Sequence, residues 1–144
     1  MEAHLTDVTR VIQLAVAPVF LLTSVAAIIG ALNNRLGRIV DRRRVLQERL
    51  RGCAEADERD YRAELLVLSS RIRITYFSIF AAVLSALLVC LVVAAAFVGA
   101  LAGVDLYKTV AVLFILAMGS LVACLGMFLR EVFLAVASKG HDRR

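Results

Sequence analysis

Three long apolar runs divide this chain, and charged residues fill the segments between them. Residues 11–32, 74–104 and 109–129 contain no ionisable side chain except tyrosine and cysteine. A helix needs about 20 residues to cross about 30 Å of hydrocarbon. A backbone in lipid must also satisfy its own hydrogen bonds, which favours helices for uninterrupted apolar runs. The pattern therefore predicts an all-α membrane protein with three transmembrane helices.

Residues 33–73, between the first two runs, also show a helical pattern. Their apolar residues recur at three- and four-residue spacing, and the segment contains no proline. The pattern is interrupted at "GCAEADERD", residues 52–60. We expect a helical hairpin whose first arm continues helix one and whose second arm leads into helix two. The apolar residues of the two arms are Leu36, Ile39, Val40, Leu46, Leu50, Tyr61, Leu65, Leu68 and Ile72.

Each arm of this hairpin has an apolar stripe that needs to be buried. We favour packing of the arms on each other and on neighbouring copies of the chain, as in a helical bundle. The alternative is a docking site for another protein, with the acidic turn at residues 55–60 as its exposed tip.

The distribution of basic residues predicts the orientation of the chain in the membrane. Arg10 is the only basic residue before the first run, Lys108 the only one between the second and third, and four follow the third. Because cytoplasmic loops carry an excess of lysine and arginine, we expect residues 33–73 and the C-terminus in the cytoplasm. The eleven arginines of 33–73 are Arg35, Arg38, Arg42, Arg43, Arg44, Arg49, Arg51, Arg59, Arg62, Arg71 and Arg73.

These features give a plan of seven segments. The positive charge follows the first run instead of preceding it, so we expect a retained helix and not a cleaved signal peptide. In chain order the plan has a short extracytoplasmic N-terminus (1–10), transmembrane helix one (11–32), the cytoplasmic hairpin (33–73), transmembrane helix two (74–104), an outer loop (105–108), transmembrane helix three (109–130) and a cytoplasmic amphipathic tail (131–144).

Composition supports the membrane class and disfavours several functions. Hydrophobic residues make up 61% of the chain, above the roughly 45–50% of soluble domains. The formal net charge is +5, but the arginines of the hairpin are mixed with seven acids and one aromatic residue. This mixture does not suit a nucleic-acid surface. With no catalytic motif, no C-x-x-C spacing and two histidines near opposite ends, we expect no enzyme activity, no cofactor and no metal site.

Helix one has a stripe of small and polar residues along one face. One interpretation is close packing, because small residues let membrane helices approach each other. The other is that the stripe, repeated around a symmetric oligomer, lines a water-filled path. Only the symmetry of the assembly separates the two. The stripe, which supplies the candidate pore-lining residues, consists of Gln13, Ala17, Phe20, Ser24, Ala27, Ala31, Asn34 and Arg38, with Phe20 interrupting it.

Two further features of the sequence concern helix contacts. Small residues recur at four-residue spacing in helices two and three, which is typical of close packing. Where the third helix leaves the apolar run, we expect Glu131 to pair with an arginine of the hairpin and Arg130 to reach the headgroups. The small residues are Ala95, Gly99, Gly103, Gly119 and Ala123.

The residues "IQLAVAPVFLLTSVAAIIGALNNRLGRIVDRRR" (12–44) and "FLREVFLA" (128–135) resemble a family of small bacterial integral membrane proteins catalogued only as a domain of unknown function. The resemblance covers nearly the whole chain. It implies the same plan of three helices and a location in the bacterial inner membrane. It assigns no activity, and therefore no functional residue.

Two functional hypotheses follow. The first is a homo-oligomeric ion channel or pore in which helix one lines the path and the hairpins form a cytoplasmic vestibule. The second is a structural or regulatory scaffold whose hairpin binds a cytoplasmic protein partner or anionic membrane lipid. The candidate residues for lipid or partner binding are Arg35, Arg42, Arg43, Arg44, Arg71 and Arg73.

Overall fold

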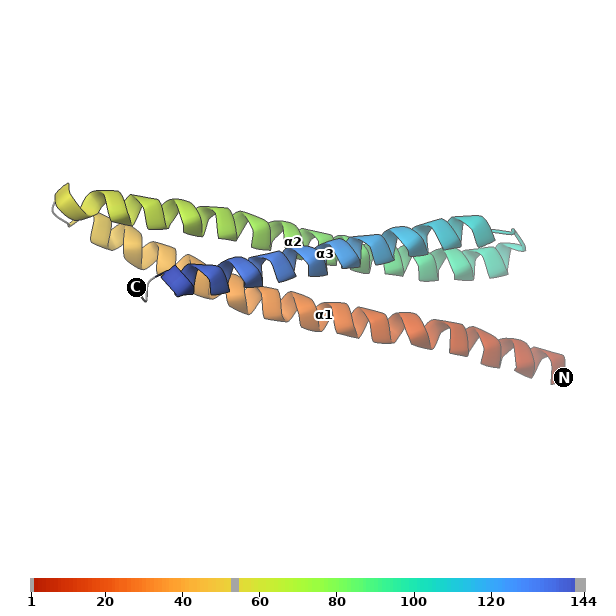
Figure 1. Ribbon diagram of the computed structural model, residues 1–144. Coiled ribbons are helices and arrows are strands. Elements are labelled where there is room, and N and C mark those ends of the chain that lie inside the picture. Colours follow the sequence, from red (N-terminus) through yellow and green to blue (C-terminus); the bar gives the residue numbers. More distant parts are fainter. Residues whose placement is uncertain (1, 53–54, 142–144) are drawn as a thin grey trace. The chain divides into compact units, whose positions relative to one another are not determined.

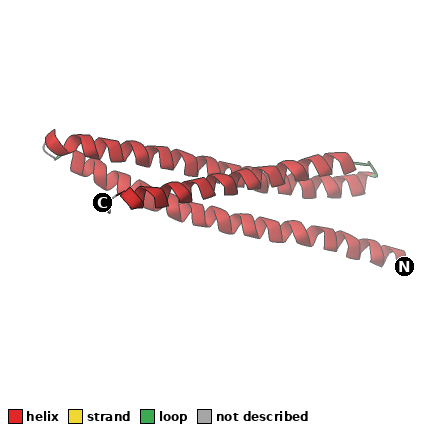
Figure 2. Ribbon diagram, in the orientation of Figure 1, coloured by secondary structure: helices red, strands yellow, loops and turns green. Residues whose placement is uncertain are grey.

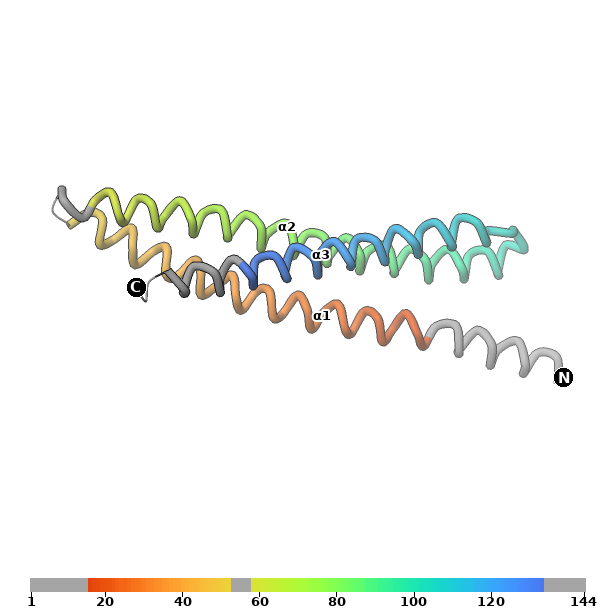
Figure 3. Tube along the Cα trace, in the orientation of Figure 1, coloured from red at the N-terminus to blue at the C-terminus, as the bar shows by residue number. Residues whose placement is uncertain are grey.

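The computed structural model describes residues 2–52 and 55–141, with side chains for 16–52 and 58–133, the coloured part of the tube in Figure 3. The described residues form three α-helices and no strand (Figure 2). These helices are α1 (Glu2–Leu50), α2 (Glu55–Ala102) and α3 (Tyr107–His141) (Figure 1). The all-helical class predicted from the sequence is confirmed.

Each apolar run lies within a longer helix. α1 has 49 residues, which at 1.5 Å per residue is about 73 Å, more than twice the hydrocarbon thickness of about 30 Å. The stretches long and apolar enough to cross a membrane are Val16–Leu50, Glu58–Ala102 and Tyr107–Phe133. In their most apolar windows only 11%, 28% and 11% of the residues are buried within the chain. These largely uncovered apolar helices indicate a multi-pass membrane protein.

The helix boundaries differ from the sequence-based plan at two places. α1 begins at Glu2, so the backbone of the expected N-terminal segment is already helical. α2 begins at Glu55, so the interruption between the hairpin arms is shorter than residues 52–60. The acids after Gly52 suit the first turn of a helix, because negative charge is favourable at a helix N-terminus.

Contacts between the helices group into two units, each with a part of all three helices. We call Met1–Ile29 with Ala81–Val122 the apolar unit, and Gly30–Phe80 with Ala123–Arg144 the charged unit. Each unit has its own core, and the two cores differ in chemistry.

In the apolar unit, hydroxyl groups join α2 to α3. Ser85 Oγ donates a 2.9 Å hydrogen bond to the carbonyl of Ala117, and Ser120 Oγ donates a 2.7 Å bond to the carbonyl of Ala81. A hydroxyl without a partner is costly in an apolar environment, so these bonds satisfy both serines and hold the helices close. The other buried residues of this core are Val25, Ala82, Val89 and Val92.

The turn between α2 and α3 depends on two glycines of the small-residue pattern. Gly103 has a left-handed backbone with φ of 65°, and Val104 N donates a 3.2 Å bond to the carbonyl of Gly99. This is the arrangement that closes many helix C-termini, and glycine adopts it without steric cost. A Cβ on Gly99 would lie 3.2 Å from the carbonyl oxygen of Val104. Both glycines therefore serve the turn, and a contact of these residues with another copy of the chain stays a prediction.

In α3, the small residue Gly119 also makes no close helix contact within this chain. A Cβ built on Gly119 would meet no heavy atom within 4 Å outside its own helical neighbourhood. Close packing at this position therefore requires another copy of the chain, and it stays a prediction.

The core of the charged unit consists of larger apolar side chains from the two arms of α1 and α2. Ile39 and Leu46 of α1 are buried with Leu68 and Ile72 of α2. The partly buried residues packed against them are Leu36, Tyr61 and Leu65. The stripes of the two arms thus cover each other within one chain. Val40, expected in the same stripe, remains 39% exposed.

Candidate functional site

A carboxylate occupies a core position of α3. Ala117, Cys124 and Glu131 recur every seven residues, and their exposed fractions are 0%, 0% and 1%. Residues seven apart share one face of a helix, so Glu131 continues a buried seam. A carboxylate at a buried position requires partners, because its charged form is strongly disfavoured away from water.

Two arginines from the other helices supply these partners within the charged unit. Arg35 Nε of α1 lies 3.1 Å from Oε1 and 3.0 Å from Oε2 of Glu131. Arg71 Nη2 of α2 lies 4.0 Å from Glu131 Oε1. Each arginine side chain is 21% exposed. We call these three residues the arginine clamp.

In the clamp one carboxylate faces two guanidinium groups, and Glu131 Oε2 is buried without a hydrogen-bond donor among the residues with described side chains. Two guanidinium groups and one carboxylate give a formal charge of +1. Arg71 Nε is buried and has no hydrogen-bond partner among the residues with described side chains. The Arg35 guanidinium also lies over the ring of Phe128, with Cζ 5.4 Å from the centroid, a favourable cation–π arrangement. The clamp is therefore a positively charged site whose arginine side chains are partly exposed.

Three further arginines of the charged unit, each within three residues of a clamp residue in the sequence, are exposed. Arg38, Arg73 and Arg130 are exposed and form no ion pair with any described side chain. Of the hairpin arginines, Arg42 pairs with Glu64 at 2.9 Å, and Arg62 pairs with Glu58. Most positive charge in this unit thus has no acidic partner within the described chain.

The six residues expected to bind lipid or a partner separate into different environments. Arg35 and Arg71 meet at Glu131. Arg42 is held in its ion pair with Glu64. Arg44 and Arg73 are exposed, and Arg43 is half-buried. The expected pairing of Glu131 with a hairpin arginine is confirmed, and the second arginine at the same carboxylate is what the sequence pattern did not indicate.

The candidate pore-lining stripe of α1 is exposed throughout its described part. Every described member, from Ala17 to Arg38, is exposed, and the exposed fraction of Phe20 is 70%. The Gln13 side chain lies outside the described residues. Ser24 Oγ donates to the carbonyl of Phe20 at 3.0 Å, within its own helix. The stripe therefore makes no helix contact inside the chain.

A different face of α1 provides its buried contacts. Val25, Leu32, Ile39 and Leu46, spaced by seven residues, are 0%, 1%, 9% and 1% exposed. This seam lies beside the stripe on the helical wheel. Consequently the stripe remains available to lipid, water or another copy of the chain.

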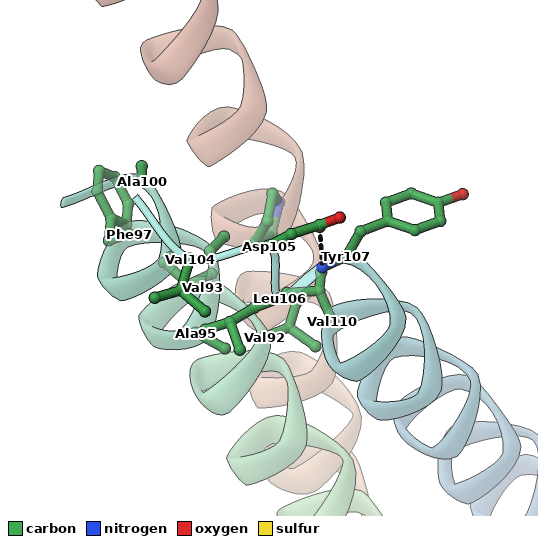
Figure 4. A pocket seen from close by; sticks show the side chains of 13 residues that line it. Val92, Val93, Ala95, Phe97, Ala100, Val104, Asp105, Leu106, Tyr107 and Val110 are labelled. Atoms are coloured by element: carbon green, nitrogen blue, oxygen red, sulfur yellow. Dashed lines mark hydrogen bonds between the residues drawn. The ribbon is translucent and has the colours of Figure 1, made fainter. Parts of the chain in front are cut away.

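The apolar unit also contains a groove of about 550 Å³. Figure 4 shows Val92, Phe97, Val110 and other apolar side chains around it, with Asp105 as the acidic member. The Asp105 carboxylate accepts a 3.1 Å hydrogen bond from Tyr107 N, which fixes the start of α3. The groove thus brings no set of reactive groups together.

Metal-ligating side chains do not cluster in the described part of the chain. No group of three or more histidine, cysteine or acidic residues occurs there with geometry for a metal. Cys90 is exposed and Cys124 is buried, both as free thiols. Cys53 lies outside the described residues.

A family model described as "Protein of unknown function (DUF2721)" matches residues 15–139. The match includes the described part of the α1 stripe and all three residues of the clamp. No curated protein and no solved structure matches the chain.

Proposed function

The chain belongs to the family of unknown function whose model it matches, and we propose that this protein is a homo-oligomeric ion channel or pore. In this proposal α1 lines the path, and the arms of α1 and α2 beyond the apolar runs form a vestibule. The assembly lies in the bacterial inner membrane with the N-terminus outside and the C-terminus in the cytoplasm, following the excess of arginine in 33–73. The role involves no catalytic step and no cofactor.

The observation that supports this proposal is the exposure of the whole described stripe of α1. Asn34 and Arg38, at its end, make no hydrogen bond or ion pair with a described side chain. Both residues follow the apolar run, so they lie at the inner end of the stripe. A ring of copies that turns this small and polar face toward a common axis forms a water-filled path with these side chains at its inner mouth, and membrane oligomers are commonly cyclic.

The proposal is tested by conductance in planar bilayers. Ser24→Leu and Asn34→Ala change the polarity of the path at two depths, so we expect each to alter unitary conductance by about two-fold or more. Val19→Leu is the matched control, because Val19 is 60% exposed but lies off the stripe. Conductance that is the same in all three variants would remove α1 as the lining helix.

A second candidate function is a scaffold whose hairpin binds a cytoplasmic protein or anionic lipid. The observation that favours it is the run Arg42–Arg44, in which Arg43 and Arg44 have no ion-pair partner among the described side chains. A cluster of arginines close to a membrane helix is a common site for anionic partners.

The scaffold hypothesis is tested by reversing the charge of this run. Arg43→Glu with Arg44→Glu should abolish co-purification of a partner, while Arg59→Glu, also at an exposed hairpin position, should not. Unchanged co-purification in the double variant would contradict this function. The test is independent of conductance, so the two hypotheses can fail separately.

A further inference from the structure

We propose that the arginine clamp binds a phosphate group at the membrane surface, carried by an anionic lipid headgroup or by a free phosphate ion. Arg35 and Arg71 provide the donors, and Glu131 is the carboxylate that shares these two guanidinium groups with the phosphate. This site is separate from the path along α1 and from the Arg42–Arg44 run. It rests on the lipid-binding part of the scaffold function proposed above and assigns that part to Arg35 and Arg71, so variants that leave the Arg42–Arg44 run unchanged test it.

The positions of the clamp residues along their helices place them at headgroup level. Arg35 follows the first apolar run by three residues, and Arg71 precedes the second run by three residues. Glu131 follows the third run by two residues. A helix that leaves the hydrocarbon reaches the phosphate layer within about one turn, or 5.4 Å. All three residues therefore lie where phosphate groups are concentrated.

The charge of the clamp requires an anion that the described chain does not supply. One carboxylate serves two guanidinium groups, and no second described acid pairs with either of them. An unneutralised charge that is four-fifths buried is unfavourable. Exposed Arg38, Arg73 and Arg130 add positive potential in the same unit, which attracts anions to it.

The geometry leaves donors for such an anion. Arg35 contacts both oxygens of Glu131 through Nε alone, so its terminal nitrogens keep their N–H groups. Phe128 supports the flat face of the same guanidinium. A planar guanidinium with a free edge binds phosphate through two parallel hydrogen bonds. The 21% exposure of each arginine provides the access.

The alternative role of the clamp is purely structural, as an ion pair that joins three helices. The two roles make different predictions for lipid binding by Glu131→Gln. If the clamp is only a structural ion pair, removal of the carboxylate lowers stability and does not strengthen lipid binding. If the clamp is a phosphate site, lipid binds more tightly, because the substitution removes the acid that competes with phosphate for the guanidinium groups.

The experiment uses the full-length protein in a neutral detergent. Short-chain phosphatidylglycerol, phosphatidylcholine and inorganic phosphate are each titrated in, and the thermal unfolding midpoint is followed by circular dichroism. Native mass spectrometry records retained lipid. We expect binding of phosphatidylglycerol to fall about five-fold in Arg71→Gln and in Arg35→Gln, the effect of one arginine near an anionic group. Arg59→Gln, an exposed hairpin arginine, is the charge-matched control and should bind as the unchanged protein does.

In Glu131→Gln we expect about five-fold tighter binding of the same lipid, together with a lower unfolding midpoint without lipid. A response to phosphatidylglycerol alone assigns the site to lipid, and an equal response to inorganic phosphate assigns it to the free ion. Equal binding by Arg71→Gln and Arg59→Gln would overturn the proposal. So would weaker lipid binding by folded Glu131→Gln.

Arg71→Lys provides a second variant if Arg71→Gln loses its helical signal. Lysine keeps the charge but lacks the planar fork, so we expect phosphatidylglycerol binding between that of Arg71→Gln and the unchanged protein. Binding equal to the unchanged protein would contradict the role given to the guanidinium.

Discussion

The apolar unit and the charged unit use the same three helices but hold them together differently. In the apolar unit, Ser85 and Ser120 donate hydrogen bonds to backbone carbonyls of the opposite helix, among small neighbours such as Ala82 and Ala117. In the charged unit, Leu46, Leu68 and similar large side chains form the core.

This difference follows from the solvent expected around each unit. In lipid, burying an apolar side chain gains little, because the hydrocarbon outside is equally apolar, so helices associate through close packing and hydrogen bonds. In water, removal of apolar surface is the dominant favourable contribution. The serine bonds of the apolar unit suit helices in lipid, and the large apolar side chains in the core of the charged unit suit helix arms in water.

Glu131 is the buried carboxylate of the charged unit, and its removal should have the largest effect on stability. Glu131→Leu leaves Arg35 and Arg71 mostly buried without a counter-charge, which we expect to cost roughly 3–5 kcal/mol. Unfolding by denaturant in detergent micelles measures the loss. Replacing all three residues of the clamp with leucine should recover most of it, because no unpaired charge then remains. A triple variant as unstable as Glu131→Leu would contradict this explanation.

A smaller effect is expected from truncation of the core of the charged unit. Leu46 is 1% exposed, and Leu46→Ala should cost about 3 kcal/mol by lost burial and cavity formation. Leu66→Ala is the control, since Leu66 is 73% exposed. The same denaturant titration compares them, and equal losses would show that burial of Leu46 does not stabilise this core.

Loss of a serine in the apolar unit should cost less. Ser85→Ala removes the bond to the Ala117 carbonyl, and inter-helix hydrogen bonds in membranes contribute about 0.6 kcal/mol on average. The effect should be measurable in the same detergent assay. A loss above about 2 kcal/mol would show that the apolar unit depends on polar contacts more than membrane helices usually do.

The smallest effect should come from an exposed ion pair of the hairpin. The Arg42 and Glu64 side chains are 55% and 42% exposed, and such pairs contribute about 0.2–1 kcal/mol. Arg42→Gln should therefore change the unfolding free energy slightly, and added salt should reduce the difference. A salt-independent loss comparable to that of Glu131→Leu would contradict the contrast between exposed and buried pairs.

The sequence by itself determined the helices and much of their surface. A backbone in lipid must satisfy its own hydrogen bonds, and an uninterrupted apolar run of more than 20 residues favours a helix over a strand of a closed barrel, so α1, α2 and α3 follow from hydropathy. The three- and four-residue spacing of Leu36, Ile39, Leu65 and Leu68 likewise identified the faces that pack between the hairpin arms. These are local properties, because periodicity along one helix fixes which side chains share a face.

Only the tertiary structure decided which faces meet and in what register. Glu131 and Arg35 are 96 residues apart, and nothing in either helix specifies that Arg71 reaches the same carboxylate. Gly99 and Gly103 fitted a packing pattern, but the left-handed turn at Gly103 gives them another role. The physical reason is that register depends on how two helices pack along their whole length, which the pattern of one helix does not contain.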